Sequence, residues 1–297
     1  MLRWAKLMTA RELMLEAAAT LKEAGIDKPW FEAQLLLGWV LGKDQAAVLT
    51  HDEFALSDQQ AQLFRQGVEE RRKRKPFAYI TGIKPFLHWD FCVSEDVLIP
   101  RPETEILVEL AVQELNKAFP GQSVLVADIG AGSGAIGLSM LMLLPSARLY
   151  AVDCSILALK VAQRNAEKYG LVARAIFLPG DLCAPLEQLR GQFACIVANL
   201  PYVAAREYAD LQPEISGYEP REALVSGADG LCHYRRLLRQ AADYLLPGGL
   251  LFVEIGSTQA QEVQRLFRSG GFAAPRVEKD LAGLVRIVWG TKTENAI

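Results

Sequence analysis

The stretch Val124-Leu125-Val126-Ala127-Asp128-Ile129-Gly130-Ala131-Gly132-Ser133-Gly134 decides the fold of this chain. Its first six residues form a mostly apolar run that predicts a buried strand, and a helical pattern follows the glycines. Glycines at alternate positions let the backbone turn sharply and come close to a ligand beside the N-terminus of a helix. A tight turn without a ligand would have the same composition, so the loop indicates a ligand site only together with the segments around it.

Strands and helices alternate on both sides of this loop. Strands are expected near residues 123–128, 147–152, 173–178, 193–198 and 249–255, and helices near 103–117, 135–143, 155–169, 230–245 and 258–269. Such alternation is typical of an α/β protein with a parallel, doubly wound sheet. Two β-rich segments, 276–280 and 284–288, flank a turn at Gly283 and predict a C-terminal antiparallel hairpin that closes the sheet.

The first 80 residues differ, because they carry helical patterns only. Thr9 with Glu12 and Ser57 with Gln60 form capping boxes before two of the expected helices, which predicts a small helical bundle. The bundle ends in a basic run at residues 71–75. We interpret this run as a solvated helix end whose cations complement the helix dipole, and contact with an acidic partner is the alternative.

Length and composition fit an ordinary globular protein. The chain has 297 residues, of which 51% are hydrophobic and 23% charged, a size typical of about two domains. The predicted parts are a helical domain at 1–80, a β-hairpin linker at 81–101 and an α/β domain at 102–297. Residues 91–297 hold 19 basic against 23 acidic residues, a balance that argues against nucleic acid as the primary substrate.

The sequence contains no pattern typical of a metal site, a disulfide framework or a membrane segment. The five cysteines are scattered without a Cys-x-x-Cys pair, and His51, His88 and His233 lie too far apart for metal-ligand spacing, which favours structural or surface roles. No apolar run reaches about 18 residues, and the charged pattern that follows Met1 is unlike a signal peptide. We expect a cytoplasmic protein with reduced thiols, no bound metal and no contact with a membrane.

An acidic residue after the second strand indicates which class of ligand the glycine loop binds. Asp153 lies 23 residues after Gly130 and can accept hydrogen bonds from ribose hydroxyls. The third glycine comes one position too early for the dinucleotide pattern, and the loop has no basic residue for a pyrophosphate, so S-adenosylmethionine fits better than a nicotinamide cofactor. Asp181 and Leu182 could edge a pocket for adenine, although a turn-forming role of Asp181 is an equal alternative.

The tetrapeptide Asn199-Leu200-Pro201-Tyr202 directly follows the apolar strand expected at 193–198. Open α/β sheets place their sites at the C-terminal ends of the strands, so this segment should face the methyl donor. A planar acceptor nitrogen must be held in line with the methyl carbon, and the Asn199 side-chain oxygen and the Leu200 carbonyl can accept its two N–H groups. Pro201 would fix the turn and Tyr202 would form an aromatic wall. The alternative is a purely structural Asn-x-Pro turn.

These segments carry a resemblance to known enzymes. Residues 128–134, the Val152-Asp153 step and Asn199-Leu200-Pro201-Tyr202 resemble seven-stranded S-adenosylmethionine-dependent methyltransferases. Further segments, 97–105 (VLIPRPETE), 219–224 (EPREAL), 227–231 (GADGL) and 254–256 (EIG), resemble the N5-glutamine methyltransferases that modify peptide chain release factors. The likeness covers nearly the whole chain.

The resemblance implies an activity, a cofactor and a partner. The chain would carry a doubly wound seven-stranded methyltransferase sheet and would transfer a methyl group from S-adenosylmethionine to the side-chain amide nitrogen of a glutamine. That glutamine would belong to the Gly-Gly-Gln motif of class I release factors, so the enzyme would support translation termination, and the N-terminal helices would help to dock this substrate. The expected cofactor-binding residues are Gly130, Ala131, Gly132, Ser133, Gly134, Asp153, Asp181, Leu182 and Asn199, and the expected catalytic residues are Asn199, Leu200, Pro201 and Tyr202.

The chain departs from the family pattern at one catalytic position. Leu200 stands where the family usually has the first proline of Asn-Pro-Pro-Tyr, so the carbonyl acceptor is kept while one locked φ angle is lost. We expect this change to affect efficiency more than chemistry. The sequence Asn-Leu-Pro-Tyr also resembles the motif of ribosomal RNA adenine dimethyltransferases, so an adenine-N6 methyltransferase acting on RNA or DNA is the alternative.

Overall fold

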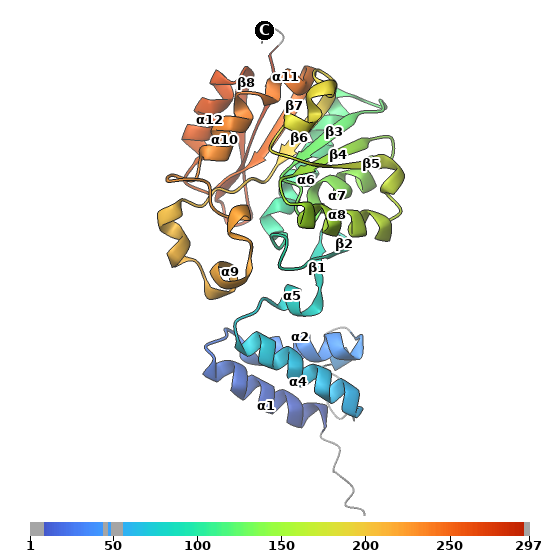
Figure 1. Cartoon of the computed structure of the whole chain (residues 1–297), viewed down its shortest axis with the longest axis vertical. Helices are drawn as coiled ribbons and strands as arrows, with labels where there is room; N and C mark the ends of the chain where they lie inside the picture. The colour runs from blue at the N-terminus through green and yellow to red at the C-terminus, as the bar shows by residue number, and fades with distance from the viewer. Residues whose placement is uncertain (1–8, 44–46, 49–55, 294–297) are drawn as a thin grey trace, which may run out of the picture. The chain divides into compact units, whose positions relative to one another are not determined.

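The computed structural model describes residues 9–43, 47–48 and 56–293, and these form two compact units (Figure 1). The first unit contains the chain up to Gly82 together with Gln212–Tyr218, and the second contains Ile83–Leu211 and the residues from Glu219 onward. All but the first two residues of the segment expected as a hairpin linker thus belong to the second unit, and one short segment from the middle of the chain belongs to the first. The boundaries 1–80, 81–101 and 102–297 stay a prediction.

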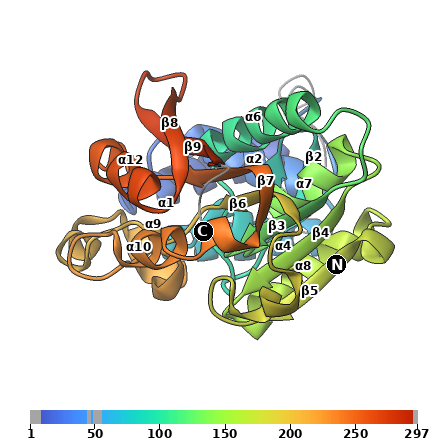
Figure 2. The same ribbon diagram turned by 90° about the horizontal axis from the view of Figure 1, so that it is seen from above.

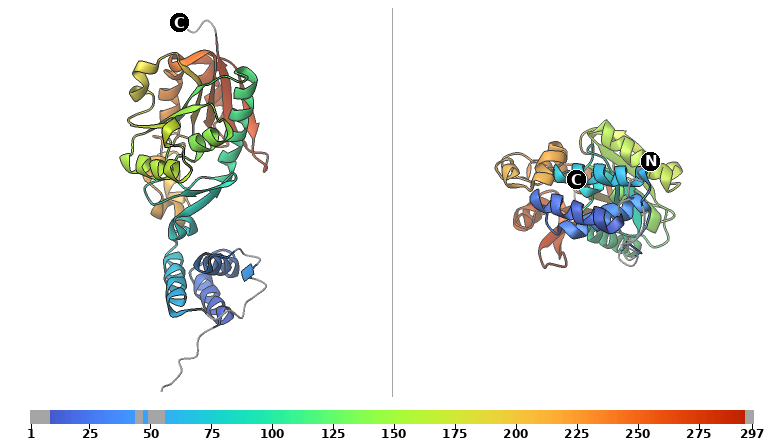
Figure 3. Two further views of the ribbon diagram at one scale, coloured as in Figure 1. Left: turned by 90° about the vertical axis from the view of Figure 1, so that its right-hand side faces the viewer. Right: turned by 90° about the horizontal axis from the view of Figure 1, so that it is seen from below.

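The first unit is a helical bundle. Its helices are α1 (Ala10–Glu23), α2 (Pro29–Leu41), α4 (Asp58–Arg72), α5 (Phe77–Thr81) and α9 (Pro213–Tyr218). Both expected capping boxes are present, since the Thr9 hydroxyl accepts the Glu12 N–H at 3.2 Å and the Ser57 hydroxyl accepts the Gln60 N–H at 3.3 Å. Helices α1, α2 and α4 lie against one another (Figure 3), and their apolar side chains form a buried core.

The basic run at the end of α4 is held by acidic residues of the same unit. The guanidinium of Arg71 is buried and contacts Glu32 at 3.2 Å and Glu214 of α9 at 3.1 Å, and Arg74 also contacts Glu214, at 2.9 Å. The interpretation of a solvated helix end is therefore wrong for Arg71, because a buried cation requires a paired anion. It is correct for Arg72, which is half-exposed and pairs with a glutamate of its own helix.

The second unit is built on a seven-stranded sheet with the order β5-β4-β3-β6-β7-β9-β8. Its strands are β3 (Leu125–Ile129), β4 (Arg148–Asp153), β5 (Ala175–Pro179), β6 (Phe193–Ala198), β7 (Leu245–Glu254), β8 (Phe272–Lys279) and β9 (Val285–Lys292). The first five are parallel, and β9 lies antiparallel to both β7 and β8. The expected doubly wound sheet with a C-terminal antiparallel hairpin is confirmed. The glycine loop follows β3, which lies between β4 and β6 in the sheet.

Helices cover both faces of this sheet (Figure 2). One apolar core lies under α6 (Pro102–Ala118), α7 (Ala135–Leu143) and α8 (Ile156–Lys168), and the other under α10 (Cys232–Leu238), α11 (Ala241–Tyr244) and α12 (Ala260–Ser269). Short 3-10 helices lie at Val172–Arg174, Ala184–Leu189, Ala205–Asp210 and Arg221–Ala223. Within the described ranges, no helix combines the length and the apolar character that crossing a membrane would require.

The helix expected at 230–245 is wrong in its second half. Helix α10 ends at Leu238, α11 has four residues, and β7 already begins at Leu245. The apolar residues around Leu245 suit a buried helix or a buried strand equally, and periodicity does not separate the two. Pro247 decides against the helix, because proline lacks the N–H that a helix interior needs.

The expected hairpin is confirmed, and a side chain of α8 connects it to the rest of the second unit. It consists of β1 (Ile83–Phe86) and β2 (Trp89–Cys92), which pair antiparallel. The side-chain amide of Asn165 in α8 exchanges two hydrogen bonds with the Cys92 backbone, at 2.7 and 3.0 Å, and also donates to the Ser133 carbonyl at 2.9 Å. One buried asparagine therefore joins the hairpin to the glycine loop.

Candidate active site

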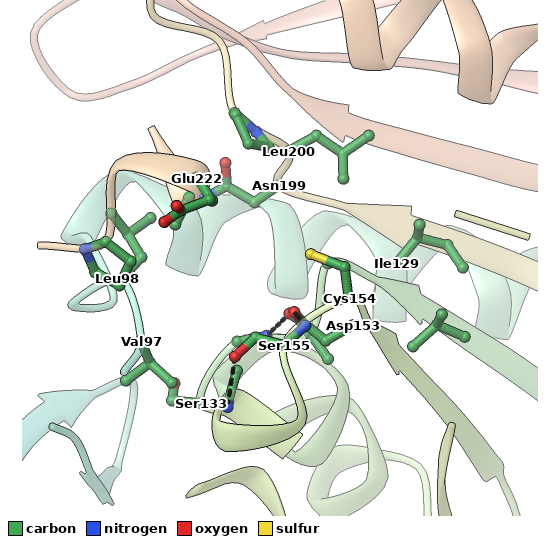
Figure 4. A pocket seen from close by; sticks show the side chains of 18 of the residues that line it. Val97, Leu98, Ile129, Ser133, Asp153, Cys154, Ser155, Asn199, Leu200 and Glu222 are labelled. Atoms are coloured by element: carbon green, nitrogen blue, oxygen red, sulfur yellow. Dashed lines mark hydrogen bonds between the residues drawn. The ribbon is translucent and has the colours of Figure 1, made fainter. Parts of the chain in front are cut away.

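A cavity of about 380 Å³ opens at the C-terminal ends of β3, β4 and β6, and Figure 4 shows Asp153, Cys154 and Asn199 among its side chains. It includes most of the residues that the sequence predicted for the site, namely Gly130, Ala131, Gly132, Ser133, Asp153, Asp181, Leu182, Asn199, Leu200 and Pro201. Gly134 and Tyr202 are not among its lining residues. The roles of these residues stay predictions, but strand order brings together four segments that are far apart in the sequence.

The glycine loop is shaped by backbone contacts to the neighbouring strand. The N–H groups of Gly130 and Ala131 donate to the Val152 carbonyl at 2.8 and 3.0 Å. Gly130 has φ +79°, and a Cβ atom there would lie 2.9 Å from the Leu200 side chain, so this position requires glycine. Gly132 has φ +54°, and open space lies where its Cβ would be, so a ligand can approach its backbone.

Asp153 forms hydrogen bonds that the sequence did not reveal. Its Oδ2 accepts the Gly132 N–H at 2.8 Å, and its Oδ1 accepts the Ser155 N–H at 2.8 Å. The carboxylate thus orders the glycine loop and the start of α8. Each carboxylate oxygen has two acceptor positions, so one on each oxygen is left for ribose hydroxyls.

A second aspartate lies behind the loop. Asp128, near the end of β3, is fully buried, and burial raises the pKa of its carboxyl group to about 7. Its Oδ2 accepts the Gly137 N–H at 2.9 Å, whereas Oδ1 has no hydrogen-bond partner among the described residues. Asp128 therefore supports the first turn of α7 without lining the cavity.

The segment after β5 reaches the cavity as expected. Leu182 is buried and has a left-handed backbone with φ 51°. Asp181 lines the cavity and also forms an ion pair with Arg236 of α10, so its carboxylate already has a cationic partner. Cys154, which the sequence reasoning missed, follows Asp153 directly and lines the same cavity. The sequence could have indicated Cys154, because it directly follows the residue that is predicted to bind the ribose.

The tetrapeptide after β6 divides into lining and supporting residues. Asn199, Leu200 and Pro201 line the cavity. The Leu200 carbonyl, a predicted acceptor for the substrate, lies 3.0 Å from the hydroxyl of Tyr234, whose single proton is shared with the Glu254 carbonyl. At least one lone pair of the Leu200 carbonyl is left for a second donor. Tyr202 is largely buried, and burial raises its pKa to about 12; its carbonyl accepts Nε2 of Gln259 at 2.9 Å. Its role as an aromatic wall stays a prediction.

Two buried side chains lie beside Asn199. Its Nδ2 donates to the hydroxyl of Thr104, the third residue of α6, at 3.3 Å. Glu254 ends β7, and it and Asn199 directly follow the paired residues Val253 and Ala198 of the two neighbouring strands. Burial raises the pKa of the Glu254 carboxyl to about 7, while hydrogen bonds from the Thr104 and Asn199 side chains act to lower it. Oε2 of Glu254 has no hydrogen-bond partner among the described residues. Both residues lay in segments that supported the family resemblance, but the sequence assigned them no role.

A wall of the cavity is fixed by an ion pair between Arg101 and Glu219, which lie in segments 97–105 and 219–224. Oε1 of Glu219 accepts Nη2 of Arg101 at 2.5 Å, and its Oε2 accepts the Ile99 N–H at 3.4 Å. The Glu219 side chain is almost fully buried, and burial raises its pKa although Arg101 opposes that shift. These bonds hold the backbone that presents Val97 and Leu98 to the cavity.

The histidines differ in their surroundings. His233 lines the cavity, and its Nδ1 lies 2.7 Å from the buried Ser226 hydroxyl. Burial lowers the pKa of His233. His88 is exposed, as a surface role predicts. His51 and the first eight residues, on which the signal-peptide expectation depended, lie outside the described residues.

Comparisons with known proteins cover both units. The family model described as the PrmC N-terminal domain matches residues 12–82, and that described as the methyltransferase small domain matches residues 104–215. A release factor glutamine methyltransferase from Moorella thermoacetica is 43% identical over 93% of this chain and 96% of its own length. One from Geobacter sulfurreducens is 38% identical over 96% of this chain and 97% of its own length.

A solved structure supports the fold alone. The T. thermophilus 16S rRNA methyltransferase in complex with AdoMet and guanosine has a TM-score of 0.51 at 19% identity, over 71% of this chain and 49% of that chain. The similarity lies in the architecture of the sheet and its helices.

Proposed function

The chain belongs to the family of release factor glutamine methyltransferases and is a methyltransferase, and we propose its methyl donor, its substrate and the roles of its site residues. The donor is S-adenosylmethionine. The substrate is the glutamine of the Gly-Gly-Gln motif in class I release factors, so the reaction supports translation termination. The observation that carries the proposal is the juxtaposition of Asn199 and Leu200 with the glycine loop at one cavity.

The residues around the cavity fit the cofactor. Backbone at Gly132 is open to close approach, as the methionine part requires, and Asp153 retains an acceptor position on each oxygen for the ribose hydroxyls. Leu182 and Cys154 supply apolar surface for adenine, with Asp181 at the edge. The bound cofactor would supply an electrophilic methyl group attached to a sulfonium.

The acceptor residues hold the substrate nitrogen. The Asn199 side-chain oxygen and the free lone pair of the Leu200 carbonyl accept the two amide N–H groups, which places the nitrogen in line for transfer. An amide nitrogen becomes acidic as it gains a methyl group, so its surplus proton can leave to water without a dedicated base. The work of the site is orientation, and the buried carboxyl groups do not need to remove a proton.

The first unit docks the release factor. None of the described residues that line the cavity belongs to this unit, so its contribution is to binding and not to chemistry. No observation favours adenine methylation, since the rRNA methyltransferase matches in fold alone and the second unit carries no excess of basic residues.

Transfer of labelled methyl groups tests the proposal. Purified protein is incubated with methyl-labelled S-adenosylmethionine and one of three acceptors: a class I release factor, the same factor with the motif glutamine replaced by alanine, or ribosomal RNA. We expect label in the intact factor only. Label in the RNA, or equal label in the altered factor, would refute the proposed substrate.

A further inference from the structure

Three polar side chains from three elements meet at the acceptor end of the cavity, and two of them, Glu254 and Thr104, are buried. Glu254 ends β7, Thr104 lies in the first turn of α6, and Asn199 follows β6. Glu254 and Thr104 are 2% and 3% exposed, so neither can exchange its partner for water. Buried polar groups are costly unless they are hydrogen-bonded, so their arrangement needs a physical reason.

The reason lies in the direction of the hydrogen bonds. The Asn199 amide has an oxygen that only accepts and a nitrogen that only donates, and a half-turn about its last side-chain bond exchanges the two. Gripping the N–H of a substrate amide requires the oxygen to face the cavity. The 3.3 Å contact from Nδ2 to the Thr104 hydroxyl is the arrangement that leaves the oxygen free.

Thr104 alone cannot enforce that arrangement, because a hydroxyl both donates and accepts. An ionised carboxylate is only an acceptor, so Glu254 accepts from the side chains of both Thr104 and Asn199. It thereby commits the hydroxyl proton of Thr104 and leaves the Thr104 oxygen to accept an N–H of Asn199. We propose that Glu254 is a positioning residue that turns the Asn199 amide oxygen toward the substrate, both directly and through a hydrogen-bond relay over Thr104. The inference rests on the proposed function, because it assigns the amide orientation that methyl transfer to glutamine needs.

Protonation of Glu254 would reverse the relay. A protonated carboxyl can donate to Thr104, which is then free to donate to the Asn199 oxygen. The charged groups that face Glu254 are Glu103, which raises its pKa, and Arg286, which lowers it; burial is the largest influence and brings the pKa to about 7. Tyr202 and Tyr234 stay neutral between pH 6 and 9, because burial raises the pKa of both. The rate of methyl transfer should therefore fall as the pH is lowered through about 7.

Single-turnover methyl transfer to whole release factor, at saturating cofactor and between pH 6 and 9, tests the relay. Glu254→Gln and Thr104→Val should each slow transfer by about tenfold or more, since misplaced reacting groups lose effective concentration. Affinity for S-adenosylmethionine should stay within about twofold, because neither residue belongs to the ribose or adenine contacts. The glutamine variant should also lose the dependence on pH near 7. Thr104→Ser keeps the hydroxyl and should recover most of the rate.

Two further measurements separate positioning from general damage. Ser139→Ala removes another buried hydroxyl of the second unit, one that has no hydrogen-bond partner in the described chain, and should transfer at the wild-type rate. In an Asn199→Ala background, Thr104→Val should cause no additional loss, since it has no amide left to orient.

The possible outcomes distinguish failure of the proposed function from failure of the relay. If wild-type protein does not methylate the release factor, the proposed function fails, and the relay, which rests on it, fails with it. If wild-type protein is active, the relay is refuted by a wild-type rate and pH profile in Glu254→Gln, or by an equal Thr104→Val defect with and without Asn199.

Discussion

The cofactor half and the acceptor half of the cavity are each backed by a buried carboxyl group, but they are held together in different ways. In the cofactor half, Asp128 and Asp153 bind backbone N–H groups that lie 9, 21 and 2 residues away. In the acceptor half, Asn199 bonds Thr104 across 95 residues, and Tyr234 bonds the Leu200 carbonyl across 34. The first half is therefore assembled by contacts within one pair of neighbouring strands and the helices that follow them, and the second depends on segments that are farther apart in the sequence.

This difference separates two kinds of failure. A change in the cofactor half should weaken binding of S-adenosylmethionine, since those residues shape a cradle for it. A change in the acceptor half should slow the transfer with binding intact, because its residues orient a nitrogen. Measuring cofactor affinity and transfer rate for variants of Asn199 and Asp153 tests the division, because a variant that affects the wrong quantity contradicts it.

The largest effect is expected for Asn199→Ala. Loss of the amide oxygen should lower kcat by about a hundredfold or more, the scale of a lost positioning or transition-state hydrogen bond. Asn199→Asp should be no better near pH 8, since it removes the donor to Thr104 and places a second carboxylate beside Glu254. Single-turnover transfer at saturating cofactor measures both variants. A wild-type rate in Asn199→Ala would make the tetrapeptide a structural turn.

Asp153→Ala should have the next largest effect, and on binding. Removing a charged acceptor of the ribose hydroxyls costs about 1.5 to 3 kcal/mol, which is a loss of about 10- to 150-fold in affinity for S-adenosylmethionine and its demethylated product. Because Asp153 also holds Gly132 and Ser155, a control on the ligand side is needed. A product analogue without ribose hydroxyls should bind wild type and variant alike. Calorimetry that shows equal affinity of both proteins for the natural cofactor would contradict the assignment.

The same difference explains how much of each half of the cavity could be predicted from the sequence. The glycine loop, Asp153 and the seven strands were predictable, because apolar runs, glycines and a fixed spacing are local signals. Thr104 and Tyr234 were missed, because nothing near either residue shows which carbonyl or amide it will meet. The inclusion of α9 in the first unit was missed for the same reason, since its ion pair joins Glu214 to Arg71 over 143 residues.

A smaller effect is expected when the first unit is altered. Removing residues 1 to 75 should raise KM for whole release factor by about tenfold, equivalent to about 1.4 kcal/mol of docking contacts, with cofactor affinity kept. A short Gly-Gly-Gln peptide should show less change. Glu214→Gln in the full chain controls for the loss of ion pairs within the first unit. It breaks the ion pairs to Arg71 and Arg74 while leaving the helices in place. Unchanged kinetics of the truncated enzyme with whole factor would assign the helices a role other than docking.

The smallest effect on rate is expected for Leu200→Pro, which restores the usual family residue. Leu200 precedes Pro201, so its backbone is already restricted to extended conformations and an added ring locks little more. The carbonyl acceptor is kept, and kcat should stay within about threefold of wild type.

The Leu200 side chain, however, is buried against the glycine loop, so replacing it should lower the free energy of unfolding by about 1 to 2 kcal/mol. Leu200→Ala is the matched control, with a larger cavity and no locked angle, and should lose about 2 to 3 kcal/mol at a similar rate of transfer. Thermal unfolding and single-turnover transfer measure the two variants. A large gain of rate in the proline variant alone would show that backbone freedom at Leu200, and not the distant contacts of Thr104 and Tyr234, limits the acceptor half.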